Sequence, residues 1–320
     1  MTCHNCSSLC KKFGKFGPKK IQRYRCKQCK RTFSEEHEKA QGPLDDMRIS
    51  LDKAEMCLQL LLEGNSIRSI QRITGLHQVT ILKLLVLAGN RCERFMDHKM
   101  RKVKCSDLQF DEIWTFCRMK EKVKTRKGLT SDHLGDAYCF TAFERDSKLI
   151  LAWHLGRRTE QDTVAFVEKV YDAVDGTENK IQITTDGFGP YPNAIAYSLG
   201  TRSSYAQLVK VYGAPVDDDH KYSPSKIKEC IPTPLWGNPN PERICTSHVE
   251  RQNLNIRTAL RRFTRLTIGF SKKWENLRAM LALYFAYYNF VRIHSSIRCT
   301  PAMEAGITKT VWTLRDLLAA

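Results

Sequence analysis

The sequence contains no long uncharged hydrophobic run. Nowhere do 18 or more apolar residues follow one another, which is the length that a membrane-spanning helix requires. The first residues, MTCHNCSSLC, also lack the apolar segment of a secretory signal peptide. We find no internal repeat and no low-complexity tract. These absences argue against a membrane-spanning or secreted protein, and they predict a cytoplasmic protein with no membrane partner.

Acidic residues are scarce in two stretches of the chain. No Asp or Glu precedes Glu35, although residues 1–34 hold ten Lys and Arg, and none occurs between Arg251 and Lys273, which hold seven. The 320 residues carry 52 Lys and Arg against 34 Asp and Glu, a net charge of +18. This excess favours a polyanionic partner, nucleic acid first and an anionic membrane surface second. A basic protein without such a partner is the alternative. Two clusters indicate two stretches that contact phosphates, and hence a nucleoid-associated protein.

The thirteen cysteines are of two kinds. An odd number without an export signal argues against a disulfide framework. Most are scattered in apolar contexts and are expected to be small buried side chains. Four others form two Cys-x-x-Cys pairs separated by nineteen residues, namely Cys3, Cys6, Cys26 and Cys29.

The two cysteine pairs have the spacing of a zinc ribbon. Each pair can present two thiolates at a tetrahedral angle, and two pairs close a four-sulfur cage around Zn²⁺. Such a cage leaves no open position, so the zinc is expected to be structural and to drive the folding of residues 1–40. A redox dithiol or a chance spacing is the alternative.

Residues 47–97 follow a linker at 41–46 and show helical periodicity. One helical pattern ends at Gly64, and two more meet at Gly75. Two short helices joined at a glycine, with a preceding support helix, predict an all-α helix-turn-helix DNA-binding domain over 47–97. A generic three-helix bundle shows the same pattern and stays open as an alternative.

Residues 105–290 change to strand-like runs and then to mixed elements. Three strands in hairpin order precede a helix, a short strand that ends at Asp186, a second helix and a further strand. The order β-β-β-α-β-α-β is that of an RNase-H-like α/β fold, a mixed sheet flanked by helices. Residues 214–245 are expected to be irregular, a long helical stretch is expected from Thr246 to Asn289, and 291–320 is expected to be a C-terminal tail.

Three carboxylates stand out among the 34 acids. Asp111 lies inside an apolar strand, where an acid is costly unless it is paired or bound to a cation. Asp186 ends the short strand, and Glu250 begins the basic helical stretch. Because the first and fourth strands of an RNase-H-like sheet are neighbours, Asp111 and Asp186 should lie side by side, with Glu250 brought to them by a helix. Glu112 points to the opposite face of its strand and is therefore not expected to be a ligand.

Three converging carboxylates would repel one another unless cations neutralised them. Two Mg²⁺ or Mn²⁺ ions about 4 Å apart would do so and would make a phosphoryl-transfer site. Each acid also has a structural alternative. Asp111 can be a satisfied strand acid, Asp186 a turn former, and Glu250 an acid favoured by the helix dipole.

Further polar groups surround Glu250. Asn253, Arg257 and Arg261 are spaced to form one ridge of a helix, which predicts contact with the DNA backbone beside the cut site. A solvated basic face is the alternative. His248 could assist proton transfer, bind DNA or cap the helix.

These segments resemble transposases of the insertion-sequence-one type. The resemblance rests on CHNC…RYRCKQCKRTF, FDEIW, TTDGFGPY, TSHVERQNLNIRTALRRFTRLTIGFSKK and YNFVRIHSSIRCTPAMEAGI, and so touches nearly the whole chain. It implies that Asp111, Asp186 and Glu250 form a DDE triad with Mg²⁺ or Mn²⁺. It also implies zinc on the four paired cysteines, helix-turn-helix binding of terminal inverted repeats, and a bacterial or archaeal mobile element. Some relatives divide the two halves between two reading frames, whereas here they are continuous.

The sequence therefore predicts a DNA transposase that binds the ends of an insertion sequence and catalyses strand cleavage and strand transfer. Pairing of two element ends implies a homo-oligomer, at least a dimer, with double-stranded element-end and target DNA as partners. A DNA-binding regulator with an inactive catalytic domain is one alternative. A related RNase-H-like nuclease or resolvase is the other.

Overall fold

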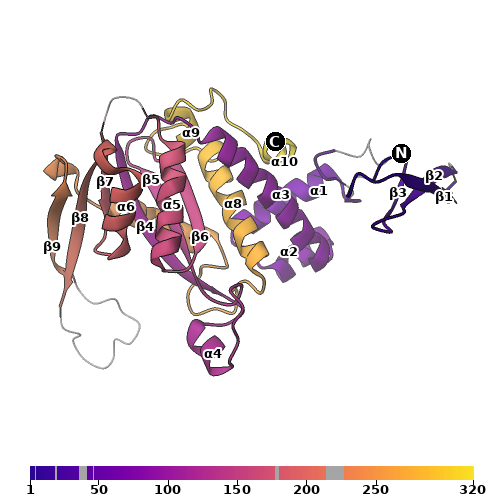
Figure 1. Cartoon of the computed structure of the whole chain (residues 1–320), viewed down its shortest axis with the longest axis horizontal. Coiled ribbons are helices and arrows are strands. Elements are labelled where there is room, and N and C mark those ends of the chain that lie inside the picture. The colour runs from indigo at the N-terminus through magenta and orange to yellow at the C-terminus, as the bar shows by residue number, and fades with distance from the viewer. Residues whose placement is uncertain (4, 19, 36–41, 46, 177–179, 214–226) are drawn as a thin grey trace. The chain divides into compact units, whose positions relative to one another are not determined.

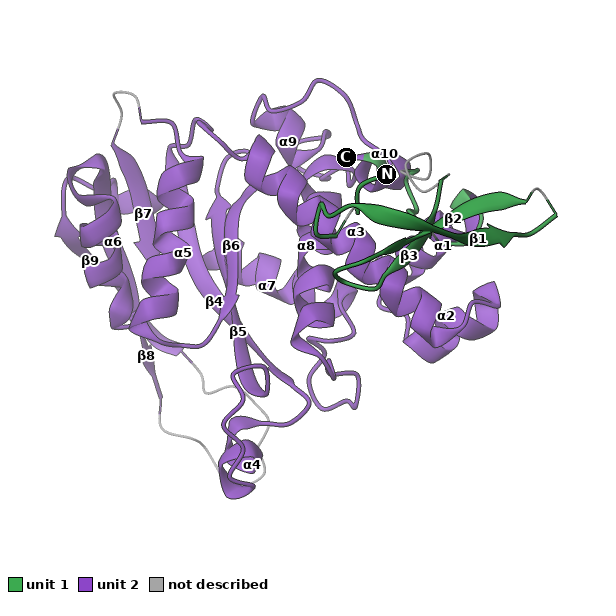
Figure 2. Ribbon diagram, turned by 45° about the vertical axis from the view of Figure 1, so that its right-hand side comes forward, with its two compact units in different colours: residues 1–51, 319 green, residues 52–318, 320 purple. Residues whose placement is uncertain are grey.

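The computed structural model describes residues 1–3, 5–18, 20–35, 42–45, 47–176, 180–213 and 227–320 (Figure 1). The chain divides into two compact units, residues 1–51 and residues 52–318 (Figure 2). Within the described residues no single helix has the length and hydropathy of a membrane span. The bent pair made of Ile67–Thr74 and Gln78–Lys99 reaches these limits only when both helices are taken together.

The first unit contains a small three-stranded antiparallel sheet. Its strands, in spatial order, are β1 (Cys10–Phe16), β2 (Ile21–Cys26) and β3 (Thr32–Ser34). Most of its surface is exposed, and only Cys3, Cys26 and Leu44 are buried apolar residues among those described. So small a core cannot hold the sheet together alone, which is why the cysteine pairs matter to its fold.

The second unit begins with three helices, α1 (Leu51–Leu62), α2 (Ile67–Thr74) and α3 (Gln78–Lys99). The Ser66 side chain caps α2 by accepting a hydrogen bond from the Ser69 amide. Gly75 ends α2 in the left-handed conformation, with φ of 72°, and α3 then starts after two more residues. Helices α2 and α3 meet at 107°. The three helices expected within 47–97 are thus present with the glycine stops that the sequence indicates.

These helices are not a separate domain, because α3 packs along α8 (Trp274–Phe290) near the end of the chain. Gly89 of α3 lies so close to α8 that a Cβ there would be 2.4 Å from the Ala279 carbonyl oxygen. Phe95 of α3 also packs against Phe290, with ring centroids 4.8 Å apart. The expected domain boundary near residue 97 is therefore wrong, since the apolar face of α3 is buried by a helix some 190 residues away in sequence.

A six-stranded mixed sheet forms the centre of the second unit, in the spatial order β6-β5-β4-β7-β8-β9. Its strands are β4 (Asp107–Cys117), β5 (Gly135–Glu144), β6 (Ile150–Gly156), β7 (Ile181–Thr185), β8 (Ser203–Tyr212) and β9 (Ile227–Trp236). β4, β7 and β8 are parallel, while β5, β6 and β9 pair antiparallel with their neighbours. The first and fourth strands are neighbours, as the sequence predicts.

Helices cover both faces of this sheet. On one face lie α5 (Glu160–Ala173) and α6 (Pro190–Ser198), in front of the strands in Figure 1. Phe110 of β4 points to that face and contacts Phe166 and Tyr191. On the other face lies α7 (Ser247–Ala259), where the Val249 amide donates to the Gln109 side chain. A mixed sheet flanked by helices is therefore confirmed, and a short helix, α4 (Glu121–Arg126), lies between β4 and β5.

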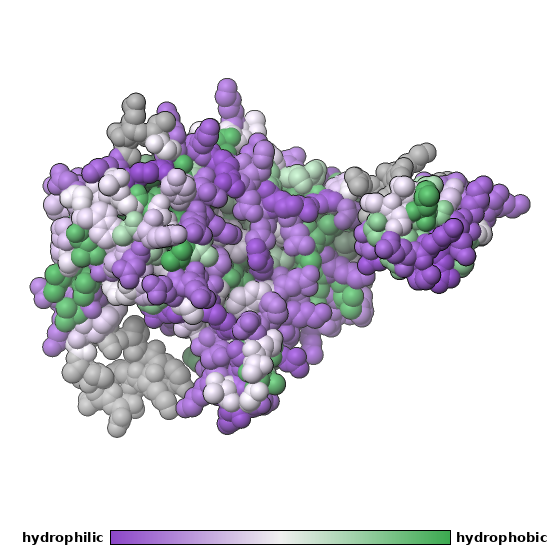
Figure 3. Space-filling view, in the orientation of Figure 1, coloured by the Kyte–Doolittle hydropathy of each residue, from purple (hydrophilic) through white to green (hydrophobic). Residues whose placement is uncertain are grey.

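Three expected boundaries differ from the structure. Within 214–245, expected to be irregular, residues 227–236 form β9, whose exposed apolar side chains are visible with those of β8 at one side of Figure 3. Residues 214–226 lie outside the described residues. The long helical stretch is two helices, because the chain leaves the helix after Ala259 and resumes at Trp274. The tail contains α9 (Pro301–Glu304) and α10 (Leu314–Ala319).

Candidate metal centres

The four paired cysteines gather in the first unit. Their sulfur atoms all lie within 4.8 Å of one another, a group that could hold one metal ion. Cys3 Sγ lies 3.5 Å from Cys29 Sγ, and Cys6 Sγ lies 3.4 Å from Cys26 Sγ. Each sulfur thus faces one from the other pair, which is the closed arrangement expected of a structural four-sulfur site.

Backbone amides stabilise the thiolates of two of these four cysteines. The Asn5 amide donates to Cys3 Sγ, and the Cys29 amide donates to Cys26 Sγ, each at 3.4 Å. The first of these bonds lowers the pKa of Cys3. The second lowers the pKa of Cys26 to about 6. Thiolate is the form that binds metal, so these two hydrogen bonds favour metal binding at Cys3 and Cys26.

The second centre forms where β4 passes the end of β7. These strands are parallel, and their pairing ends with Phe110 opposite Thr185. Asp111 is the next residue on β4, and Asp186 is the first residue after β7, so both carboxylates lie at the same point of the sheet. The Phe188 amide donates to Asp186 Oδ1 at 3.0 Å and fixes that carboxylate in its turn. The predicted approach of the two acids is confirmed.

Glu112 joins these two acids, contrary to the prediction from strand alternation. Asp111, Glu112 and Asp186 each offer a carboxylate oxygen, and these atoms lie within 4.8 Å of one another. Alternation does place Asp111 and Glu112 on opposite faces of β4. Because β7 has already ended at Thr185, no strand separates the two faces at this level, and both carboxylates reach Asp186.

Glu112 is held firmly on the face of α6. Its side chain is 3% exposed and accepts from Arg158 at 2.7 Å. The Tyr191 hydroxyl donates to the other carboxylate oxygen at 3.0 Å. The Arg158 guanidinium in turn stacks over the Phe188 ring, 4.2 Å from its centroid. Neither Arg158 nor Tyr191 was expected at the site, since a basic residue after a strand and a helical tyrosine carry no distinctive sequence signal.

The crowding of carboxylates changes their proton affinity. Burial raises the pKa of Asp111 to about 7, with further contributions from Glu112 and Asp186. Burial and the charge of Asp186 also raise the pKa of Glu112 to about 7, although Arg158 opposes the shift. At neutral pH the group therefore resists full ionisation, and a bound cation would relieve the repulsion.

Glu250 approaches from the other face, in the first turn of α7. Its carboxylate accepts hydrogen bonds from Lys210 Nζ on β8 and from the Thr246 hydroxyl. Glu250 is not part of the close group of acids, but it lines the same cavity, of about 660 Å³, as Asp111 and Asp186. All three predicted carboxylates thus face one hollow. Lys210 is a further side chain of this cavity that the sequence did not single out.

A network of buried polar contacts fixes the chain segment that leads into α7. Asp107, at the start of β4, is fully buried and pairs with Arg243 at 2.8 Å and with Arg145 at 3.4 Å. The Asn240 amide donates to the Gln182 side chain at 2.8 Å. These contacts tie residues 240–243 to the same strands that carry Asp111 and Asp186. The position of Glu250 relative to the sheet follows from them.

The structure does not place Asn253, Arg257 and Arg261 on one exposed ridge. Asn253 is buried, and its Nδ2 donates to Asp111 Oδ2 at 2.7 Å. Arg257 is half-buried and donates to the Phe263 carbonyl at 3.2 Å, and burial lowers its pKa to about 10. Arg261 is exposed but lies beyond the end of α7. The expected ridge fails because the helix stops before it reaches the third residue.

His248 lies away from the carboxylate cavity. Its ring stacks on Phe143 of β5, with centroids 6.4 Å apart, and it does not line the cavity. Burial lowers its pKa, and Lys148 and Arg145 add to the effect. A neutral imidazole stacked on a core phenylalanine fits a packing role better than a proton-transfer role.

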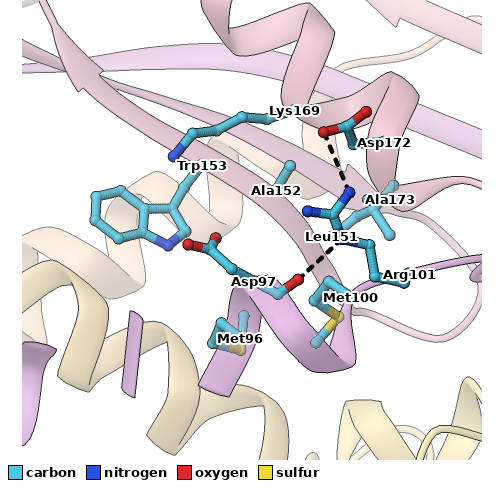
Figure 4. A pocket seen from close by; sticks show the side chains of 10 residues that line it. All are labelled: Met96, Asp97, Met100, Arg101, Leu151, Ala152, Trp153, Lys169, Asp172 and Ala173. Atoms are coloured by element: carbon cyan, nitrogen blue, oxygen red, sulfur yellow. Dashed lines mark hydrogen bonds and ion pairs between the residues drawn. The ribbon is translucent and has the colours of Figure 1, made fainter. Parts of the chain in front are cut away.

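The residues around the acids fit a divalent cation. Carboxylate oxygens are the ligands that Mg²⁺ and Mn²⁺ prefer. Asn253 Oδ1 is buried beside Asp111 and has no hydrogen-bond partner among the described residues. A small hollow lined by Asp97, Arg101, Trp153, Lys169 and Asp172 offers no such arrangement (Figure 4). Arg101 there pairs with Asp172, and the volume is only about 50 Å³.

No protein-family model and no curated protein matches this sequence. The assignment of a function therefore depends on the two centres and their surroundings.

Proposed function

We propose that this protein is a metal-dependent DNA transposase of the DDE type, with an RNase-H-like catalytic sheet. The observation that carries the proposal is the convergence of Asp111, Asp186 and Glu250 on one cavity, from β4, from the end of the adjacent strand β7 and from α7. Metal-dependent phosphoryl transfer on DNA uses such a set of carboxylates, because they hold the cations beside the scissile phosphate. The resemblance in sequence supports the same assignment.

Each residue of the cavity has a separate task in this proposal. Asp111 and Asp186 would hold the cations, with Glu250 completing the set, and Glu112 would orient its neighbours through Arg158 and Tyr191. Divalent cations bound there would activate the attacking oxygen and stabilise the leaving oxygen. Lys210 neutralises Glu250 in the absence of a cation and is placed to bind a DNA phosphate afterwards.

The other parts of the chain would bind the element ends. The 107° crossing of α2 and α3, across a turn that contains Gly75, is within the range of helix-turn-helix motifs. Helix α3 would then be the recognition helix, and its first residues, Gln78 and Val79, are exposed. The four paired cysteines of the first unit would hold Zn²⁺, and the lysines and arginines around them would contact phosphates. Alignment of two ends for joining would require at least a dimer.

The decisive experiment is strand transfer in vitro. The wild type and an Asp186→Asn variant are incubated with a labelled element-end duplex, a target plasmid and Mn²⁺. The end sequence is to be identified by searching the DNA on both sides of the gene for inverted repeats. We expect joined product from the wild type and at least a 100-fold loss in the variant, because a missing carboxylate removes a cation ligand. Glu229→Gln, an exposed acid on β9, is the matched control and should be fully active.

Three other outcomes would contradict the proposal in different ways. Cleavage without joining would indicate a nuclease or resolvase. Binding of the ends with neither reaction would indicate a DNA-binding regulator. Joining that persists in Asp186→Asn would remove this carboxylate from the catalytic group.

A further inference from the structure

A second cavity, of about 710 Å³, lies in the second unit between the helices α1 to α3 and the chain that follows α7. On one side it is lined by the turn before α2 and by the first residues of α2 and α3. On the other side it is lined by residues 261–272 and by α8. The cavity is therefore formed jointly by the proposed DNA-recognition helices and by the chain that connects α7 to α8.

The charged residues that line this second cavity, called the cleft below, are all cations. The lining includes Arg68, Arg261, Arg262 and Lys272 and contains no Asp or Glu. Among the described residues no carboxylate lies within ion-pair distance of any of these four side chains. Elsewhere in the second unit Arg145, Arg243 and Arg278 all pair with acids. An excess of unpaired cations in a hollow creates a positive potential that attracts an anion.

Arg262 is the side chain for which this matters most. It is half-buried, and among the described residues its side-chain bond is to the Ser271 hydroxyl, at 3.0 Å. Burial lowers its pKa to about 10. A guanidinium removed from water without a carboxylate partner is costly, and an anionic ligand would compensate it. The N-terminus of α2, capped by Ser66, opens on the same cleft and adds a favourable dipole.

Hydrogen bonds connect the lining of the cleft to β4, the strand that carries Asp111 of the carboxylate centre. The Arg262 carbonyl accepts from the Thr115 hydroxyl at 2.9 Å, and the Ser271 carbonyl accepts from the Arg118 amide at 2.7 Å. Both contacts fix the connecting chain to the end of β4, the strand of Asp111. From Glu250 to Ala259, α7 spans about 14 Å, roughly four base pairs of duplex DNA.

We propose that this cleft binds the phosphate backbone of double-stranded DNA, on the path that leads from the recognition helices to the carboxylate centre. The inference rests on the proposed function in taking duplex DNA as the ligand. It adds that the contacted phosphates lie four to five base pairs from the phosphate at the carboxylates. One strand of the duplex would thus contact both α2 and residues 261–272.

The test compares two double variants of the full chain that remove the same charge. Arg68→Ala with Arg261→Ala removes two exposed cations of the cleft. Lys122→Ala with Arg126→Ala removes two exposed cations of α4, which line neither cavity. Affinity for a fluorescent duplex of mixed sequence is measured between about 50 and 200 mM salt. The cleft variant should bind at least tenfold more weakly, and its plot of log affinity against log salt should be shallower by about 1.8. The α4 variant should match the wild type.

Neutral methylphosphonate linkages then locate the contact. Placed one at a time along an element-end duplex, they should weaken wild-type binding four to five base pairs from the cleavage position and have no effect there in the cleft variant. If the cleft variant keeps the wild-type affinity and salt dependence, the inference is wrong, although the proposed function stands. If the wild type binds no duplex DNA, the proposed function fails as well. If the cleft variant loses affinity only for RNA, the assignment to DNA is overturned.

Discussion

At the scale of single residues, the carboxylate centre brings the acidic side chains of Asp111, Glu112 and Asp186 close together in a partly buried site. Asp111 and Glu112 both have a pKa raised to about 7 by burial and by neighbouring carboxylates. Arg158 and Tyr191 keep Glu112 in place in spite of this repulsion. Proteins retain such unfavourable arrangements where a ligand or a reaction uses them.

The first prediction concerns the stability of the metal-free protein. An acid whose folded pKa is raised stabilises the fold below its unfolded pKa, near 4, and this contribution is lost as the pH rises through about 7. The Tm in a chelator should therefore fall between about pH 4 and pH 8. Glu112→Gln removes one of the charges. Its free energy of unfolding should therefore fall less over this pH range, by on the order of 2 kcal/mol, which corresponds to roughly 5 °C in Tm. Differential scanning calorimetry across this range measures both proteins.

Two comparisons complete this test. Mn²⁺ should raise the Tm of the wild type at pH 8 and raise that of Glu112→Gln less. Glu229→Gln, which changes an exposed acid of β9, should follow the wild type at every pH. If the Tm of Glu112→Gln depends on pH in the same way as that of the wild type, Glu112 does not repel the neighbouring carboxylates as described.

The second prediction concerns Asn253 as a positioning residue. Its side-chain amide donates to Asp111 Oδ2 at 2.7 Å, and the backbone amide of Glu112 donates to Asp111 Oδ1 at 2.9 Å. Asn253→Ala removes one of the two hydrogen bonds that orient the Asp111 carboxylate. It should weaken Mn²⁺ binding 10–100-fold, the usual cost of losing a group that orients a ligand. Asn255→Ala, on the same helix but bonded to Gln252, is the control. Calorimetric titration with Mn²⁺ decides, and equal affinity in all three proteins would contradict the role.

At the scale of elements, close contact between α3 and α8 joins the three N-terminal helices of the second unit to the rest of that unit. Gly89 permits this contact, since a Cβ at that position would lie within 2.6 Å of the backbone and side chain of Ala279. Glycine costs about 1 kcal/mol in a helix relative to alanine, so the packing must compensate for it. Helix periodicity identified α3 from the sequence, but the partner of its apolar face was not apparent there.

The third prediction follows from this contact. Gly89→Ala improves the helix propensity, yet its Cβ would force the helices apart, and overpacking of this kind costs about 1–3 kcal/mol. We expect a net fall in Tm of roughly 5 °C. Asn90→Ala, one residue on and exposed, should leave the Tm unchanged or slightly higher. Thermal unfolding followed by circular dichroism compares the two, and an unchanged Tm in Gly89→Ala would show that the helices can separate without cost.

At the scale of the whole molecule, the two units have cores of different kinds. The second unit has a large apolar core around the sheet and α8, whereas the described part of the first unit buries few apolar residues. The first unit should therefore need a bound metal ion in order to fold, whereas the second should fold without one.

The fourth prediction tests this difference. Cys29→Ser removes a proposed zinc ligand and should make residues 1–51 sensitive to proteolysis, with DNA binding weakened about tenfold through loss of its basic surface. The Tm of the second unit should stay unchanged. Cys10→Ser, which alters a cysteine near the group but outside it, is the control. Limited proteolysis with mass spectrometry and a DNA-binding titration measure the effects, and a protease-resistant first unit in Cys29→Ser would exclude a structural metal.

The sequence by itself determined the features that depend on local spacing. Two Cys-x-x-Cys pairs bring four thiols together because each pair is a tight turn, and glycines mark the ends of helices. The strand order places Asp111 and Asp186 together because β4 and β7 are parallel neighbours and Asp111 lies on β4 at the level where β7 ends. Tertiary structure alone decided that Glu112 joins them, that Lys210 meets Glu250, and that α3 packs on α8. Those contacts depend on where a neighbouring strand stops and on which distant apolar face is covered, and no local pattern records either.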